Sequence, residues 1–128
     1  MNLDFSQMIT VADKSAMKLS TTIEAIARRR FAAETAGITV NGMLAYTDRT
    51  TQMKLTAASV RAARDPAYTV DWKLASNTFV RLAADQLIAI GDAVGDYVQA
   101  CYTRESVLLT ALADGAYTDA MLEEGWPA

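Results

Sequence analysis

The fold is decided by residues 65–105, which read DPAYTVDWKLASNTFVRLAADQLIAIGDAVGDYVQACYTRE. In the first half of this stretch, apolar and polar residues alternate in two short segments, which is typical of half-buried β-strands. The second half has a long helical pattern whose apolar side needs a surface to pack on. We therefore expect a β-hairpin followed directly by the helix that covers it, with the rest of the chain packed around this unit.

The hairpin in this stretch has a preferred register. A three-residue loop that ends at Asn77, with Asn77 in the left-handed conformation, pairs Trp72 with Val80. The same register places Asp71 opposite Arg81 on the other face, which is a favourable cross-strand charge pair. A two-residue loop would instead place Arg81 opposite Trp72 on the apolar face, so we expect the first register.

The helix that follows is predicted to start near Ala84 and to extend to about Asp114. Its larger apolar residues lie on a near-heptad seam, which consists of Leu87, Val94, Val98, Cys101, Leu108 and Leu112. Gly91 and Gly95 lie in the helix interior, where each glycine costs about 1 kcal/mol relative to alanine. This cost is tolerable where another backbone comes close, and we expect the two glycines to mark packing of the helix on the sheet.

Another helix is predicted upstream, over residues 10–35. Thr10 is a good N-cap residue, and Asp13 follows three positions later, near the positive end of the helix dipole. Arg30 and Glu34 form a favourable i,i+4 pair on this helix. Its apolar side is expected to consist of Leu19, Ile23 and Ile26.

A second hairpin is indicated at residues 38–46. Asn41-Gly42 is the strongest two-residue turn signal, because a type I′ turn needs positive φ at both positions. A two-residue loop pairs Val40 with Met43 on one face. Leu44 and Tyr46 then lie on the other face, together with Thr39.

Two further helical segments complete the chain. The helix over residues 49–64 is rich in small side chains, which favours a close approach to a neighbour, and Asp65 ends it because Pro66 follows. A short last helix over residues 119–124 is capped by Thr118.

Together these elements predict an α+β fold in the order α-ββ-α-ββ-α, with a short C-terminal helix. We expect one domain over residues 1–128, made of a lead-in (1–9), a core (10–114) and a C-terminal tail (115–128). The two hairpins are expected to form one small antiparallel sheet, covered by the first and third main helices.

Length and composition are typical of one soluble globular domain. The 128 residues are 52% apolar and 21% charged, which are ordinary values for a globular protein. The N-terminus lacks the basic flank and apolar core of a secretory signal. The longest apolar runs fall far short of the roughly 20 residues that a membrane-spanning helix needs. We therefore expect a soluble cytoplasmic protein without a membrane partner.

The chain has one cysteine, Cys101, and no histidine. A single cysteine excludes an internal disulfide and a multi-thiolate metal site. The lack of histidine removes the commonest general base and the commonest transition-metal ligand. We therefore expect no enzyme activity, no metal, no cofactor and no small-molecule substrate. Cys101 is interpreted as a small core residue because it lies on the apolar seam.

Charge is distributed unevenly along the chain. Residues 1–82 carry eleven basic and seven acidic side chains, a balance of +4, whereas residues 83–128 carry one basic and eight acidic side chains, a balance of −7. Such asymmetry can mark head-to-tail self-association or an electrostatic docking surface. It is equally typical of basic and acidic helices that neighbour each other within one domain, which we favour.

The only basic run, Arg28-Arg29-Arg30, does not predict a nucleic-acid site. Consecutive residues of a helix point about 100° apart, so the three side chains cannot form one flat patch. Interleaved aromatic residues and a net positive charge are both lacking. We interpret the run as solvated or paired with acidic side chains of the same chain, with a protein contact as the alternative.

Candidate partner-binding residues are the aromatic and apolar residues outside the predicted core. Phe79 points away from the Trp72 face in the preferred register, and exposed aromatic side chains are suitable anchors in protein interfaces. The C-terminal tail adds Tyr117, Met121, Leu122 and Trp126. Trp126 either folds back as a plug or inserts into a partner.

Several segments of the chain resemble a domain of unknown function found in the tail proteins of tailed phages. They are DPAYTVDWK (65–73), FVRL (79–82), VQACYTRE (98–105), ITVNGMLAYTDRTTQMKL (38–55), LDFSQMITVADK (3–14) and the closing GWP (125–127). The similarity covers nearly the whole chain, and DPAYTVDWK together with VQACYTRE is fairly specific. Asn77 stands where relatives often have glycine, and asparagine keeps the left-handed conformation accessible.

The resemblance implies a non-enzymatic tail fibre assembly chaperone or adaptor. Such a protein helps a phage tail fibre protein to fold, trimerise or attach, and it can remain on the fibre tip. The alternative is a permanent structural virion component, such as a tail fibre, adaptor or tail-tip subunit. Either protein would be found in the cytoplasm of the infected bacterial host during assembly, and in the virion tail if it stays attached. The family carries no catalytic or ligand motif, so the resemblance does not say which surface binds the fibre.

Overall fold

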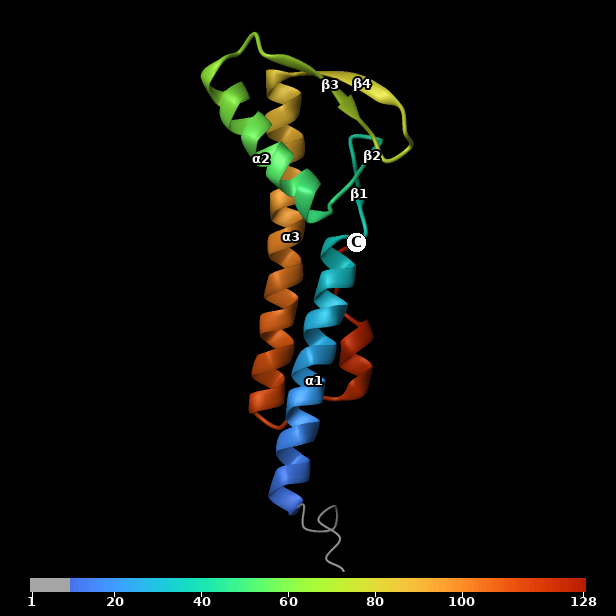
Figure 1. Ribbon diagram of the computed structural model, residues 1–128, viewed down its shortest axis with the longest axis vertical. Helices are drawn as coiled ribbons and strands as arrows, with labels where there is room; N and C mark the ends of the chain where they lie inside the picture. Colours follow the sequence, from blue (N-terminus) through green and yellow to red (C-terminus); the bar gives the residue numbers. More distant parts are fainter. Residues whose placement is uncertain (1–9) are drawn as a thin grey trace, which may run out of the picture.

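The computed structural model describes residues 10–128, which form an elongated α+β arrangement of three main helices and two β-hairpins (Figure 1). In chain order the elements are α1 (Val11–Glu34), β1 (Ile38–Val40), β2 (Met43–Ala45), α2 (Arg49–Arg64), β3 (Thr69–Lys73), β4 (Phe79–Ala83), α3 (Ala84–Ala113) and the short 3-10 helix η2 (Asp119–Glu123). The predicted order of elements is confirmed. The predicted lead-in, residues 1–9, lies outside the described residues.

The start of α1 has the predicted cap. The Thr10 hydroxyl accepts a hydrogen bond from the Asp13 amide at 3.1 Å, and the Asp13 carboxylate accepts one from the Thr10 amide at 3.2 Å. Two backbone donors that the helix itself cannot satisfy are thereby satisfied. Of the predicted apolar side of α1, Ile26 is buried, whereas Leu19 and Ile23 remain largely exposed.

Both hairpins have the predicted turns and registers. The first turns at Asn41 and Gly42, whose φ angles of 50° and 79° are those that a type I′ turn requires. The second turns at Asn77, which has a φ of 65°. The cross-strand pairs include Val40 with Met43, Trp72 with Val80 and Asp71 with Arg81.

The hairpins form two separate two-stranded sheets, so the prediction of one small sheet is wrong in this respect. The loop of the second hairpin, rather than one of its strands, contacts β2. The Ala75 amide donates to the Leu44 carbonyl at 3.1 Å, and the Tyr46 hydroxyl donates to the Ala75 carbonyl at 3.2 Å. Strands β1 and β2 have three residues each, which is the short end of the usual range.

Helix α3 is the central element on which both other helices pack. α2 packs on its N-terminal half, beside the hairpins, and α1 packs on its C-terminal half (Figure 1). The expectation that the first helix covers the sheet is therefore wrong. Gly37, with a φ of 88°, follows α1, and the first hairpin continues beyond the end of that helix instead of folding back on it.

The apolar core has two parts. The larger part lies between α2, α3 and the hairpins, and contains Leu55, Ala58, Ala62, Leu82, Ala84, Leu87, Ile90 and Val94. Buried residues between α1 and α3 form the smaller part, which contains Ile26, Ala33, Cys101 and Leu108. Cys101 is fully buried, which agrees with its interpretation as a core residue.

Gly91 marks a close approach, but to a helix and not to the sheet. A Cβ atom added at Gly91 would lie 2.2 Å from the Ser59 hydroxyl oxygen of α2. The Ser59 hydroxyl in turn donates to the Leu87 carbonyl at 3.4 Å. Gly91 therefore allows α2 to pack closely on α3, whereas a Cβ added at Gly95 would meet no atom of the described residues within 4 Å.

Candidate protein-binding sites

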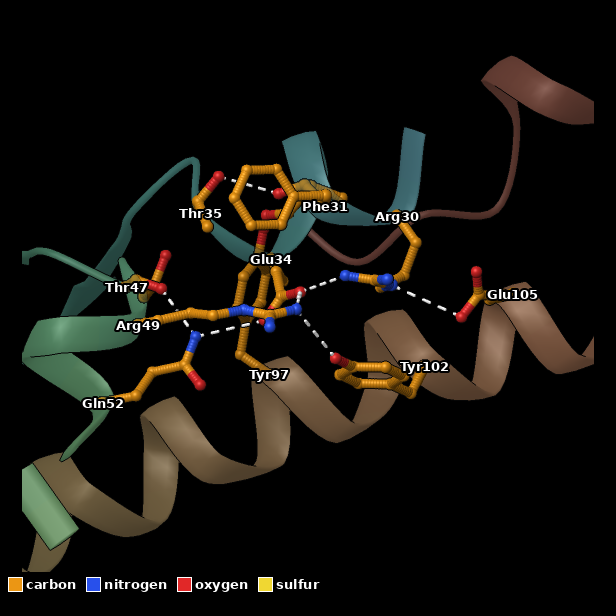
Figure 2. Close-up of polar contacts among 11 residues, drawn as sticks. Arg30, Phe31, Glu34, Thr35, Thr47, Arg49, Gln52, Tyr97, Tyr102 and Glu105 are labelled. Atoms are coloured by element: carbon orange, nitrogen blue, oxygen red, sulfur yellow. Dashed lines mark hydrogen bonds and ion pairs between the residues drawn. The ribbon is translucent and has the colours of Figure 1, made fainter. Parts of the chain in front are cut away.

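A buried polar cluster, which we call the Glu34 network, joins α1, α2 and α3 (Figure 2). The Glu34 side chain lies in the last turn of α1 and is 1% exposed. Its carboxylate accepts hydrogen bonds from Arg30 of the same helix, from Arg49 at 3.1 Å and from Gln52 at 3.2 Å. A single carboxylate thus links the end of α1 to the start of α2.

Arg30 and Tyr102 extend the network to α3. Arg30 donates through Nε to Glu105 at 3.3 Å, and its guanidinium lies 4.5 Å from the centroid of the Tyr102 ring. The Tyr102 hydroxyl accepts a hydrogen bond from Arg49 at 3.2 Å. Among the described residues, no buried side-chain nitrogen or oxygen lacks a hydrogen-bond partner.

The segment Thr47-Asp48-Arg49-x-x-Gln52 supplies the α2 side of the network. The buried Thr47 hydroxyl accepts from the Gly37 amide at 2.9 Å, and Gln52 donates to the Thr47 carbonyl at 2.8 Å. Asp48 is the N-cap of α2 and accepts from the Thr51 amide at 3.2 Å. This segment therefore both starts α2 and fixes α2 to the end of α1.

Glu34 is suited to a structural role. Burial by itself raises the pKa of Glu34, but hydrogen bonds from Gln52, Arg49 and Arg30 outweigh burial and hold the pKa below its ordinary value. A general base that works near neutral pH needs a pKa close to that pH. The lowered pKa of Glu34 therefore agrees with a carboxylate that holds three helices together.

The basic run of α1 is solvated at one position and paired at the other two. Arg28 is exposed, Arg29 forms an ion pair with Glu123 at 3.1 Å, and Arg30 belongs to the Glu34 network. The interpretation drawn from the sequence, solvation or pairing within the chain, is confirmed for these residues.

The C-terminal tail, residues 115–128, folds back onto α1 and α3 in an arrangement that we call the C-terminal clasp (Figure 1). The Trp126 indole donates to the Leu122 carbonyl at 2.6 Å, and the Arg29 guanidinium lies 5.1 Å from the centroid of the Trp126 ring. Arg104 of α3 donates to the carbonyls of Glu124 at 2.7 Å and of Met121 at 3.0 Å. Two arginines from different helices thus hold the tail.

Four of the five candidate partner-binding residues belong to this region. Tyr117, Met121, Leu122 and Trp126 are all half-buried. For Trp126, the folded-back alternative is the one that the structure contains. Tyr117 lies, with Leu19 and Leu112, at a cleft of about 400 Å³ between α1, α3 and the tail.

Phe79, the fifth candidate, lies at the other half of the molecule in what we call the hairpin cleft. This cleft has a volume of about 460 Å³ and includes Tyr46, Lys54, Trp72, Lys73 and Phe79 among its lining residues. Phe79 is 68% exposed and Tyr46 is 42% exposed, whereas Trp72 is half-buried. Phe79 and Lys73 are direct cross-strand partners.

The structure brings Phe79 together with residues that were not predicted as site residues. Tyr46 and Phe79 come from different hairpins, and Lys54 comes from α2. The sequence signal for Tyr46 was its position on the non-core face of the first hairpin, which matches the position of Phe79 in the second. No sequence rule places the two aromatic residues at one cleft, because that depends on how the hairpins meet.

Metal-binding and membrane-spanning features are absent from the part of the chain that the structure describes. No group of three or more His, Cys, Asp or Glu side chains in residues 10–128 could hold a metal ion. Within the same residues, no helix combines the length and the apolar character that crossing a bilayer requires.

Comparison with known proteins gives a family and no further relatives. No curated protein sequence and no solved structure matches this chain. One family model, described as a domain of unknown function (DUF4376), matches residues 16–124, which include all of α2, α3 and both hairpins. The chain belongs to this family.

Proposed function

We propose that this protein is a non-enzymatic assembly factor for a phage tail fibre, a chaperone or adaptor that acts through protein–protein contacts. The assignment to tail fibres is supported by the resemblance of DPAYTVDWK, VQACYTRE and ITVNGMLAYTDRTTQMKL to segments of phage tail proteins. The proposed partner is the fibre protein, and the proposed place of action is the cytoplasm of the infected host.

The observation that carries the contact role is the hairpin cleft. Phe79 is 68% exposed, and aromatic side chains are enriched at the centres of protein interfaces. Phe79 shares the cleft with Tyr46, so two exposed aromatic side chains from different hairpins are available to one partner. Aromatic residues offer large contact areas at a low cost in side-chain entropy.

The segments that resemble phage tail proteins contribute both to this cleft and to the packing of α1 on α3. Residues of DPAYTVDWK and of ITVNGMLAYTDRTTQMKL line the cleft, whereas VQACYTRE lies in the half of α3 that packs on α1. DPAYTVDWK covers β3 and the turn before it. Within VQACYTRE, Cys101 is buried and Glu105 pairs with Arg30. This distribution supports a rigid platform that presents a small binding surface.

Co-expression with the fibre gene tests the proposal. We expect more soluble, trimeric fibre when the intact protein is present, as measured by size-exclusion chromatography with light scattering. Equal yields of trimeric fibre with and without the protein would contradict the assembly role. The composition of purified particles separates the two forms of the proposal, because a permanent virion component is present in stoichiometric copies and a transient chaperone is absent.

A further inference from the structure

We infer that the hairpin cleft binds an acidic peptide segment that has a large apolar or aromatic anchor, with the anchor on Phe79 and Tyr46 and its carboxylates near Lys54 and Lys73. This inference names the chemistry of the partner segment, and it rests on the proposed function for the identity of the partner as the fibre.

The cleft has the size and the lining of a site for a large side chain. Its volume of about 460 Å³ lies within the usual range of ligand pockets, which is roughly 300–1,000 Å³. Phe79 is 68% exposed and Tyr46 is 42% exposed, so aromatic surface from both hairpins is available to an anchor. An apolar anchor would cover surface that water contacts in the free protein.

The uncommitted charges of the cleft are positive. Within residues 10–128, neither Lys54 nor Lys73 forms an ion pair. The two carboxylates that line the cleft are already engaged, because Asp71 pairs with Arg81 at 3.3 Å and Asp48 caps α2 through Thr51. A carboxylate on the incoming segment would therefore meet two free ammonium groups.

The C-terminal clasp shows how the same chain binds a segment of this chemistry. There, Arg29 pairs with the acidic Glu123 and also lies over the ring of Trp126. One cation thus recognises a carboxylate and an aromatic ring within the same short segment. The hairpin cleft has the corresponding cations and aromatic surface, but the chain supplies no segment to it from the residues that the structure describes.

A polyanion such as single-stranded nucleic acid also combines stacking surfaces with negative charge, but it fits this cleft less well. Asp48 and Asp71 would lie close to its phosphates, and the whole chain carries a net charge of −3. An acidic peptide can place its few carboxylates at the lysines and away from these two residues.

Peptide titrations of the full-length ¹⁵N-labelled protein test the inference. The probe is acetyl-Glu-Glu-Phe-Glu-Glu-amide, and the matched probes replace phenylalanine by alanine or all four glutamates by lysines. With the acidic probe, we expect amide shifts confined to residues 46–54 and 71–79. Either matched probe should bind at least about fivefold more weakly, because it lacks the aromatic anchor or the two exposed charge pairs. Raising the salt concentration should weaken binding of the acidic probe.

Variants at exposed positions make the test specific to the cleft. F79S and the double variant K54E/K73E should each weaken binding of the acidic probe by about fivefold or more. The control variants are M53S, on an exposed part of α2 outside the cleft, and K14E/K18E on α1. Both controls should bind the acidic probe as the unchanged protein does.

Three results would overturn the inference: equal binding of the acidic and basic probes, amide shifts that lie elsewhere, or tighter binding of oligothymidylate than of the acidic peptide. A dimer of the free protein that F79S dissociates would also overturn it, because a second copy would then occupy the cleft. The co-expression assay separates this inference from the proposed function. If the intact protein and K54E/K73E raise the yield of trimeric fibre equally, the inference fails alone; if neither raises it, the proposed function fails.

Discussion

The hairpin cleft and the C-terminal clasp use the same chemistry but differ in whether the chain fills the site. In the clasp, Trp126 lies against Arg29, and Glu123 neutralises that arginine. In the hairpin cleft, Phe79 is 68% exposed, and Lys54 and Lys73 have no ionic partner among the described residues. Aromatic residues next to cations therefore do not identify a binding surface until the contacts that each one makes are known.

The comparison assigns different roles to the five candidate residues. Tyr117, Met121, Leu122 and Trp126 contribute to closing the α1–α3 half of the molecule, and their binding of a partner would require the tail to leave its place. Phe79 can contact a partner without any such change. The Glu34 network lies between these two halves and links the end of α1 to the start of α2.

The largest effect is expected for E34A, which removes the carboxylate that links the end of α1 to the start of α2. The substitution leaves Arg30 and Gln52 without their buried acceptor, and breaking a buried pair costs about 3 kcal/mol. Urea denaturation should show this loss in the free energy of unfolding. The matched control is E24A, at an exposed position of the same helix, for which we expect a change of less than about 0.5 kcal/mol. Similar losses for both variants would contradict the central role of Glu34.

Acid should weaken the hydrogen bonds that the Glu34 carboxylate accepts in the unchanged protein. The pKa of Glu34 is lower in the folded protein than its ordinary value of 4.5. Its contribution to stability is therefore fully present above pH 4.5 and is lost as the pH falls through the lower folded pKa, because the unfolded chain then binds the proton first. Urea denaturation between pH 7 and pH 3 measures this loss. In E34Q the decline should be shallower, and an identical decline would assign the pH dependence to other carboxylates.

A smaller effect is expected when the clasp is opened by W126A. The variant loses the ring that Arg29 covers and the hydrogen bond to Leu122, and we expect a loss of about 1–2 kcal/mol in the free energy of unfolding. W126F keeps a ring under Arg29 and should lose less than W126A. If W126A leaves stability unchanged and instead prevents fibre assembly, Trp126 is a partner-binding residue and the clasp is only a resting position.

The sequence was sufficient wherever the determining signal is local. The cap at Thr10 and the turns at Asn41-Gly42 and Asn77 depend on neighbouring residues, and their positions were predictable. The i,i+4 pair of Arg30 with Glu34 was predictable for the same reason.

Features that depend on distant contacts were not predictable in the same way. Arg49 and Gln52 reach Glu34 from another helix, and nothing in the helical pattern of α1 indicates that Glu34 is buried. The two hairpins meet through the hydrogen bond between Ala75 and Leu44, which lie 31 positions apart. Tyr46 and Phe79 come to the hairpin cleft from different hairpins, which is why Tyr46 was not linked to Phe79.

The smallest effect on stability, and the most informative one for function, is expected for F79S. Phe79 is exposed, so its replacement should change the free energy of unfolding by less than about 0.5 kcal/mol, which urea denaturation can establish. The yield of trimeric fibre on co-expression should nevertheless fall, because the anchor of the proposed contact is gone. M53S removes a side chain that is 73% exposed and lies outside the cleft, and it should preserve the yield. If the yield of trimeric fibre with F79S equals the yield with M53S, the hairpin cleft is not the surface that binds the fibre. The C-terminal clasp then becomes the candidate binding surface.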